Sequence, residues 1–133
     1  MNALRALLST DVHKANYFAA TISGRARKII ASRTSPRAAV NFALDAVEAF
    51  EKAADAAFAA PPDAVAVASY AVEAALAARA AAVARSVGSS PETLRTASVA
   101  ALLDYVAASG DRAAELFSDE VAAQKADLRR IFG

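Results

Sequence analysis

Five side chains near the amino terminus have the types and spacing of a surface that binds an anionic partner. They are Lys14, Tyr17, Thr21, Arg25 and Lys28, separated by three, four, four and three residues. On a helix turning 100° per residue, this spacing places them within about 80° of one another. A tyrosine ring offers contact area at low entropic cost, and neighbouring cations steer an acidic partner. The pattern predicts a partner-binding helix face, and a solvated basic face is the alternative.

The same segment, residues 14–37, also fits a surface that binds nucleic acid. Arg27, Arg33 and Arg37 add to its positive charge, and residues 1–40 carry seven Lys or Arg against one acid, Asp11. Clustered cations neutralise phosphates as readily as carboxylates. We therefore keep nucleic acid as the alternative partner and an acidic protein as the preferred one.

Residue types that support catalysis or bind metals are sparse. The chain has no cysteine and one histidine, His13, which excludes thiolate chemistry and argues against a histidine metal site. Asp45, Glu48 and Asp55 could act as paired carboxylates. We expect them instead on a solvated helix face, with Glu48 paired to Lys52 one turn further on. The sequence therefore predicts no enzymatic activity, no cofactor and no metal.

Two arginines, Arg79 and Arg85, interrupt the most apolar part of the chain. Because an unpaired buried guanidinium is costly, each must reach water or a partner such as Asp104. Structural pairing is the preferred interpretation, and contact with an anionic ligand is the alternative.

The segments that carry all these residues are predicted to be helical. Hydrophobic residues recur with a helical period between four breaks of proline, glycine and small polar residues. The breaks are Thr34–Pro36, Pro61–Asp63, Gly88–Pro91 and Gly110–Asp111. At the first break, Ser35 can cap a helix that Pro36 begins. Short breaks of about two to four residues favour antiparallel neighbours. The predicted helices cover residues 11–33, 36–60, 63–87, 91–109 and 112–132, with a further short helix over 3–9.

The predicted helices differ in how much of their circumference is apolar. Residues 11–33 form an amphipathic helix with one apolar sector, whereas residues 63–87 have no clean solvent face and are predicted to be central. One side of that central helix is a seam of alanines, which lets helix axes approach closely. The seam consists of Ala64, Ala68, Ala71, Ala75, Ala78 and Ala82. For residues 36–60, the main apolar face is Val40, Ala43, Leu44, Val47, Phe50, Ala54, Ala57 and Phe58. Phe42, Ala46, Ala49, Ala53 and Ala60 extend this apolar arc, so the helix is predicted to contact neighbours on two sides.

The composition predicts one all-α domain over residues 1–133, an antiparallel bundle of five or six helices with short loops. The chain has 133 residues, 56% of them hydrophobic, and 40 are alanine. No uncharged run approaches the roughly 20 residues of a membrane span, and no secretory core is visible. We therefore expect a cytoplasmic protein without a membrane partner. Helices this apolar leave open a homo-oligomer in which a second copy covers them.

Three stretches together resemble alanine-rich, all-helical small proteins of phages and immunity proteins found beside bacterial toxins. They are SPRAAVNFALDAVEAF (Ser35 to Phe50), ARAAAVARSVGSS (Ala78 to Ser90) and QKADLRRIF (Gln124 to Phe132). The resemblance implies a protein that binds or neutralises another macromolecule, and it carries over no catalytic residues. Residues and resemblance together predict a non-catalytic protein of the immunity or inhibitor (anti-defence) type, which binds an acidic partner through its basic helix face.

Overall fold

The computed structural model describes residues 2–87 and 111–133. In these residues the fold is all-α, with no strand, which confirms the predicted fold class. The helix predicted over residues 91–109 lies outside the described residues. The helices are α1 (Asn2–Leu8), α2 (Val12–Ala31), α3 (Arg37–Ala57), α4 (Ala64–Val87) and α6 (Asp111–Phe132).

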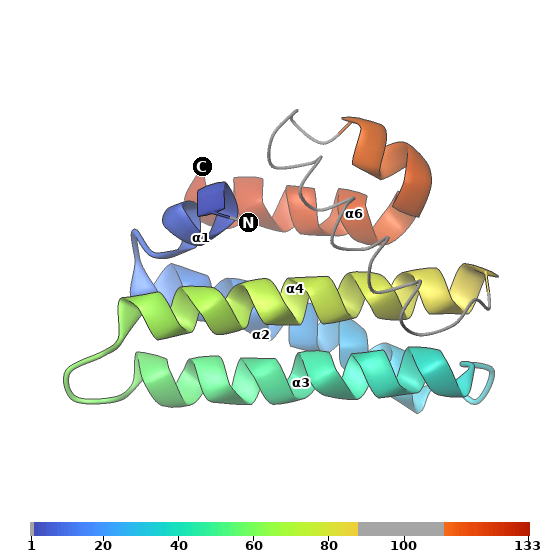
Figure 1. The fold of residues 1–133 in the computed structure, drawn as a ribbon, viewed down its shortest axis with the longest axis horizontal. Coiled ribbons are helices and arrows are strands. Elements are labelled where there is room, and N and C mark those ends of the chain that lie inside the picture. The colour runs from blue at the N-terminus through green and yellow to red at the C-terminus, as the bar shows by residue number, and fades with distance from the viewer. Residues whose placement is uncertain (1, 88–110) are drawn as a thin grey trace.

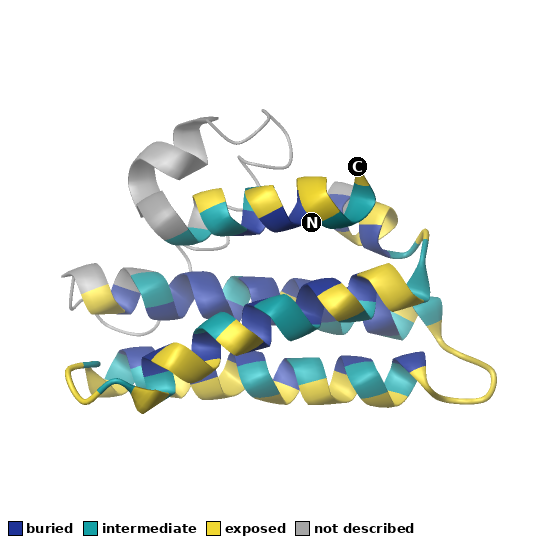
Figure 2. Cartoon of the chain, turned by 180° about the vertical axis from the view of Figure 1, so that it is seen from behind, coloured by how far each residue is buried: buried dark blue, intermediate teal, exposed yellow. Residues whose placement is uncertain are grey.

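Helix α4 is the centre of the bundle, as predicted. Helices α2, α3 and α4 run antiparallel in chain order, and α1 and α6 lie on the side of α4 away from α3 (Figure 1). Helix α4 contacts α1, α2, α3 and α6, and its contact with α3 is the most extensive. Buried residues occur on every side of α4, whereas α3 is exposed along its outer face (Figure 2).

The ends of the helices follow their capping residues, with one correction. Asp11 caps α2, because its Oδ1 accepts the backbone N–H groups of His13 and Lys14 at 3.0 and 3.1 Å. Ser35 was predicted to cap the next helix, but its hydroxyl donates to the carbonyl of Ile29 at 2.8 Å, at the end of α2. Pro36 takes the N-cap position of α3 without a side-chain bond.

The loops are partly longer than predicted. Residues 9–11, 32–36 and 58–63 connect the first four helices and are three, five and six residues long. The two longer loops exceed the predicted two to four residues because α2 ends at Ala31 rather than at residue 33 and α3 spans Arg37–Ala57 rather than 36–60. They are still short enough to join antiparallel neighbours.

The buried face of α2 is the predicted one, whereas α3 buries mainly the residues predicted to extend its apolar arc and leaves part of its main apolar face exposed. In α2, Phe18, Ile22 and Ile29 are buried as expected. In α3, Leu44 and Phe58, predicted to be buried, are 50% and 72% exposed. The buried residues of α3 are Ala39, Phe42, Ala43, Ala46, Ala49, Ala53 and Ala57. The helix therefore turns its alanines inward.

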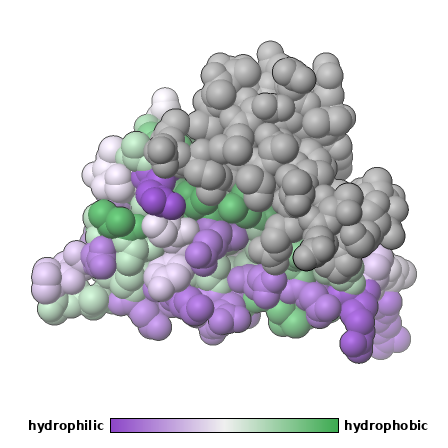
Figure 3. Space-filling model, in the orientation of Figure 1, coloured by the Kyte–Doolittle hydropathy of each residue, from purple (hydrophilic) through white to green (hydrophobic). Residues whose placement is uncertain are grey.

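Packing of small side chains explains this orientation. Four residues of the predicted α4 seam, Ala68, Ala71, Ala75 and Ala78, are buried. Outside this seam α4 also buries Ala74, Ala77, Ala80 and Ala81, and α3 buries alanines as well, so small side chains allow these helices to approach closely. The contact between α3 and α4 is the most extensive among the described helices. Over α3 the surface is mainly hydrophilic, with single hydrophobic residues between the polar ones (Figure 3).

Helix α4 contains the longest apolar segment of the described residues. Residues Ala64–Ala82 have the length and hydropathy of a membrane span, but 61% of that window is buried against the rest of the protein. The central helix of a water-soluble bundle has the same character. The length and hydropathy of this segment therefore do not distinguish a membrane-spanning helix from the buried central helix of a bundle.

Candidate partner-binding site

An opening beside the predicted basic face lies where the start of α2 meets the end of α6. We call it the α2–α6 hollow; its volume is about 430 Å³. Its lining residues are Asp11, His13, Lys14 and Tyr17 from the α2 side and Arg130 and Ile131 from α6. Two of the five predicted partner-binding residues, Lys14 and Tyr17, therefore line one concave surface.

The ring of Tyr17 is held at this surface by an arginine of α6. The guanidinium carbon of Arg130 lies 5.4 Å from the ring centroid, a cation–π distance, and Nη1 donates to the tyrosine Oη at 3.3 Å. Hydrogen bonds to Tyr17 and Asp127 raise the pKa of Arg130. Tyr17 nonetheless remains 54% exposed, so most of its ring is available for contact.

The α2 side of the hollow combines charge with an exposed aromatic residue. Lys14 is exposed, and the Asp11 carboxylate beside it is directed at the first backbone amides of α2. The ring of His13 lies 6.0 Å from that of Phe58, centroid to centroid, and Phe58 follows the last turn of α3. The hollow therefore offers two cations and an aromatic ring, with a second exposed ring at its edge.

Arg25, another predicted partner-binding residue, is engaged inside the protein. Its Nε donates to Glu120 Oε2 at 3.1 Å, and its Nη1 pairs with Asp127 Oδ2. Burial works against the charged guanidinium, but attraction and hydrogen bonds from both carboxylates outweigh it and raise the pKa of Arg25. The Glu120 and Asp127 side chains are only 10% and 12% exposed. Most of the Arg25 guanidinium is thus directed at α6.

This polar network continues to the buried Arg79. Gln124 Nε2 donates to Glu120 Oε1 at 2.9 Å and to the carbonyl of Ala75 at 3.1 Å, while its Oε1 accepts from Arg79 Nη2 at 3.1 Å. Arg79 is thus a structural residue bonded to α6, in line with the preferred interpretation. Arg85 is exposed, and the partner considered for these arginines, Asp104, lies outside the described residues.

The five predicted partner-binding residues therefore have different surroundings. Lys14 and Tyr17 line the hollow, Thr21 is half-buried and donates to the carbonyl of Tyr17 at 3.0 Å, Arg25 binds α6, and Lys28 is exposed. The sequence prediction missed Arg130, Glu120 and Asp127. Their signal was present: residues 120, 124 and 127 share one face of a helix and are all polar.

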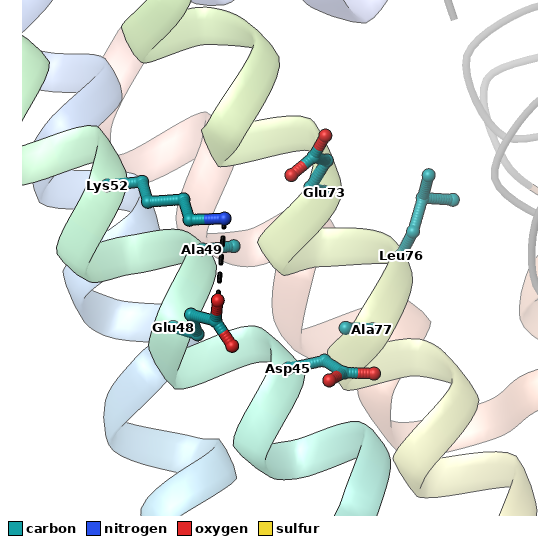
Figure 4. A pocket seen from close by; sticks show the side chains of 7 residues that line it. All are labelled: Asp45, Glu48, Ala49, Lys52, Glu73, Leu76 and Ala77. Carbon is teal, nitrogen blue, oxygen red and sulfur yellow. Dashed lines mark ion pairs between the residues drawn. The ribbon is translucent and has the colours of Figure 1, made fainter.

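A second depression lies between α3 and α4 and contains two of the three carboxylates considered for catalysis, whereas the third, Asp55, is exposed and does not line it. Its volume is about 300 Å³, and Asp45, Glu48 and Lys52 line it from α3 with Glu73 from α4 (Figure 4). Lys52 Nζ lies 3.4 Å from Glu48 Oε1, the predicted pair, with both side chains more than half exposed. Exposure of this degree fits the solvated-face interpretation.

Among the described residues, no group of three or more His, Cys, Asp or Glu side chains has an arrangement that could hold a metal ion. Comparisons with known protein families, with curated proteins and with solved structures found no match to this chain. The features of this protein that indicate a function are therefore the geometry of the α2–α6 hollow and the sequence.

Proposed function

We propose that this protein acts by binding an acidic segment of another protein at the α2–α6 hollow, without catalysis. The observation that carries the proposal is the half-exposed ring of Tyr17, which lies between Lys14 and Arg130 in a concave surface. Interface centres are enriched in tyrosine and arginine, because both give large contact area with directed polar groups. The immunity or inhibitor type is part of this proposal and rests on the sequence resemblance.

The chemistry of the hollow favours a carboxylate next to an apolar side chain. Lys14 and Arg130 supply positive charge, whereas the first amides of α2 already bind the Asp11 carboxylate. Phe58, 72% exposed and in ring contact with His13, supplies an apolar edge. An acidic segment with an apolar residue matches both features.

Nucleic acid remains a second candidate, supported by a different surface. No Asp or Glu occurs between Asp11 and Asp45, and Arg27, Lys28, Arg33 and Arg37 are exposed. These cations lie at the end of α2 and the start of α3, the opposite end of α2 from the hollow. The two candidates therefore predict different footprints on one molecule.

Nuclear magnetic resonance titration of the full chain separates the two candidates. The probes are poly-L-glutamate and a short DNA duplex, each at about 50 mM and 150 mM salt. We expect poly-L-glutamate to shift the amide signals of residues 11–17 and 129–133 while binding survives at the higher salt. Shifts confined to residues 27–37, together with DNA affinity that falls steeply with salt, would instead support nucleic acid.

Two charge variants complete this test. Lys14→Glu with Tyr17→Ser should weaken poly-L-glutamate binding about tenfold or more, because it removes the exposed ring and inverts one cation of the hollow. Arg33→Glu with Arg37→Glu changes charge at the far end and serves as the matched control. Helical circular dichroism should be unchanged in both. Equal loss of binding in the two variants would show non-specific attraction and reject the hollow as the binding site.

A further inference from the structure

The α2–α6 hollow is a composite site, and it exists only when α6 lies against α2. Arg130 and Ile131 belong to α6, whereas the other lining residues, Asp11 to Tyr17, belong to α2 and its cap. Neither side alone brackets the Tyr17 ring with two cations. Whatever positions α6 on α2 therefore decides whether the site is assembled.

Polar side chains are prominent among the α6 residues whose burial is described, 120 and 122–132. The buried ones are Gln124, Asp127 and Leu128, two of them polar. Ile131 and Phe132 pack partly against the core. Because polar contacts are directional, their hydrogen bonds and ion pairs restrain this part of α6 to a specific position.

Arg25 makes two of the bonds that fix the position of α6, in addition to those that Gln124 makes with α4. Glu120 and Asp127 are seven residues apart, which places them on one face and about 10 Å apart along the helix axis. One guanidinium that binds both carboxylates restrains α6 against rotation and against sliding. The three charged side chains are mostly buried, so salt screens these bonds less than surface ion pairs.

Asp127 transmits this restraint to the hollow. Its Oδ2 pairs with Arg25 and its Oδ1 lies 3.4 Å from Nη2 of Arg130, the residue that covers the Tyr17 ring. We infer that Arg25 is a positioning residue: it clamps α6 through Glu120 and Asp127 and thereby places Arg130 beside Tyr17. The effect of Arg25 on partner binding rests on the proposed function. The clamp, which consists of the ion pairs of Arg25 with Glu120 and Asp127, does not depend on that proposal.

Amide hydrogen exchange of the full chain tests the clamp. In Arg25→Gln, the amides of residues 124–128 should exchange about tenfold faster or more, while those of α3 keep their wild-type rates. Arg27→Gln is the matched control, since it is the same change two residues away on an exposed side chain, and it should leave α6 unaffected. Wild-type exchange of α6 in Arg25→Gln would overturn the inference, as would equal acceleration in α3.

A mutant cycle shows whether the two carboxylates mediate the effect. Glu120→Gln with Asp127→Asn should accelerate exchange of α6 as Arg25→Gln does, and adding Arg25→Gln to that variant should change the rate by less than about twofold. A purely structural role of Arg25, independent of the carboxylates, would make the effects additive. Additive effects would therefore contradict the clamp.

Binding of poly-L-glutamate separates this inference from the proposed function. If both hold, Arg25→Gln lowers the affinity for poly-L-glutamate by about the same factor by which it accelerates amide exchange in α6, although Arg25 does not line the hollow. Loosened α6 with unchanged affinity would overturn the coupling and leave the proposed function intact. Absence of binding to the wild-type chain would reject the proposed function, and the exchange rates would still decide the clamp.

Discussion

Arg79 carries a guanidinium into a core that otherwise consists largely of alanine. It is fully buried on the central helix, and its Nη2 bonds to Gln124 of α6. Gln124 in turn bonds to the carbonyl of Ala75, one turn before Arg79 on α4. A buried charge of this kind stabilises the fold only as long as its partners remain in place.

Replacing Arg79 should therefore destabilise the protein strongly. We expect Arg79→Ala to lower the free energy of unfolding by about 2–4 kcal/mol, because it leaves Gln124 Oε1 buried without its donor and opens a cavity. The double variant Arg79→Met with Gln124→Leu should lose less than half as much, since it removes both polar partners and keeps the volume. Urea unfolding followed by circular dichroism measures both values. A larger loss in the double variant would contradict this account.

Among the helices, α3 shows how the choice of buried face depends on the neighbouring helix. Most of the circumference of α3 is apolar, and its larger side chains and its alanines occupy different sectors. Packing against α2 and α4 selects the alanine sector with Phe42 as its one large buried side chain. This orientation lets the backbones of α3 and α4 approach closely, and as a consequence Leu44 and Phe58 remain largely in solvent.

Two phenylalanines of this region provide a matched test of the orientation of α3. Phe42→Ala should reduce the free energy of unfolding by about 3–5 kcal/mol, because a buried ring leaves a cavity. Phe58→Ala should change it by less than about 1 kcal/mol, because the side chain is largely exposed and its ring lies 6.0 Å from that of His13. Thermal or urea unfolding distinguishes the two. Similar losses would mean that α3 is rotated toward the face predicted from periodicity.

For the molecule as a whole, the uneven charge of the chain is partly neutralised within the fold. Residues 1–40 carry a charge of +6, and α6 directs Glu120 and Asp127 at Arg25 in that basic region. What remains outside comprises Lys14 and Arg130 at one end of α2 and the cations around residues 27–37 at the other. The fold therefore divides one basic segment into two separate surfaces.

The contribution of the Arg25 ion pairs to stability should not depend on pH in the neutral and mildly alkaline range. Their pairing raises the pKa of Arg25 above its ordinary value, so its stabilising effect is fully present below the unfolded pKa and is lost only as pH rises through the higher folded one. We expect Arg25→Gln to cost about 1–3 kcal/mol, with the same difference from wild type at every pH from about 7 to 10. A difference that shrinks over this range in urea unfolding would contradict the assignment.

Local pattern determined the helices of this protein. The period of hydrophobic residues and the breaks at Pro36, Pro61 and Gly110 placed the described helices to within a few residues, and the absence of a polar face identified α4 as central. The capping role of Asp11 and the pair of Glu48 with Lys52 are also local, since each joins residues within one turn. Helix formation depends on neighbours in sequence, which is why these features can be read there.

Only the tertiary structure decided how the helices are rotated and which side chains meet. Arg25 and Glu120 are 95 residues apart in the chain, and Tyr17 and Arg130 are 113 apart. Their contacts depend on the rotation of α6 about its axis and on its position along α2, neither of which is set by the 3.6-residue period. For the same reason Arg25 and Lys28 differ in their surroundings, although both lie on the predicted basic face of α2. Helix α6 covers Arg25 and leaves Lys28 in solvent.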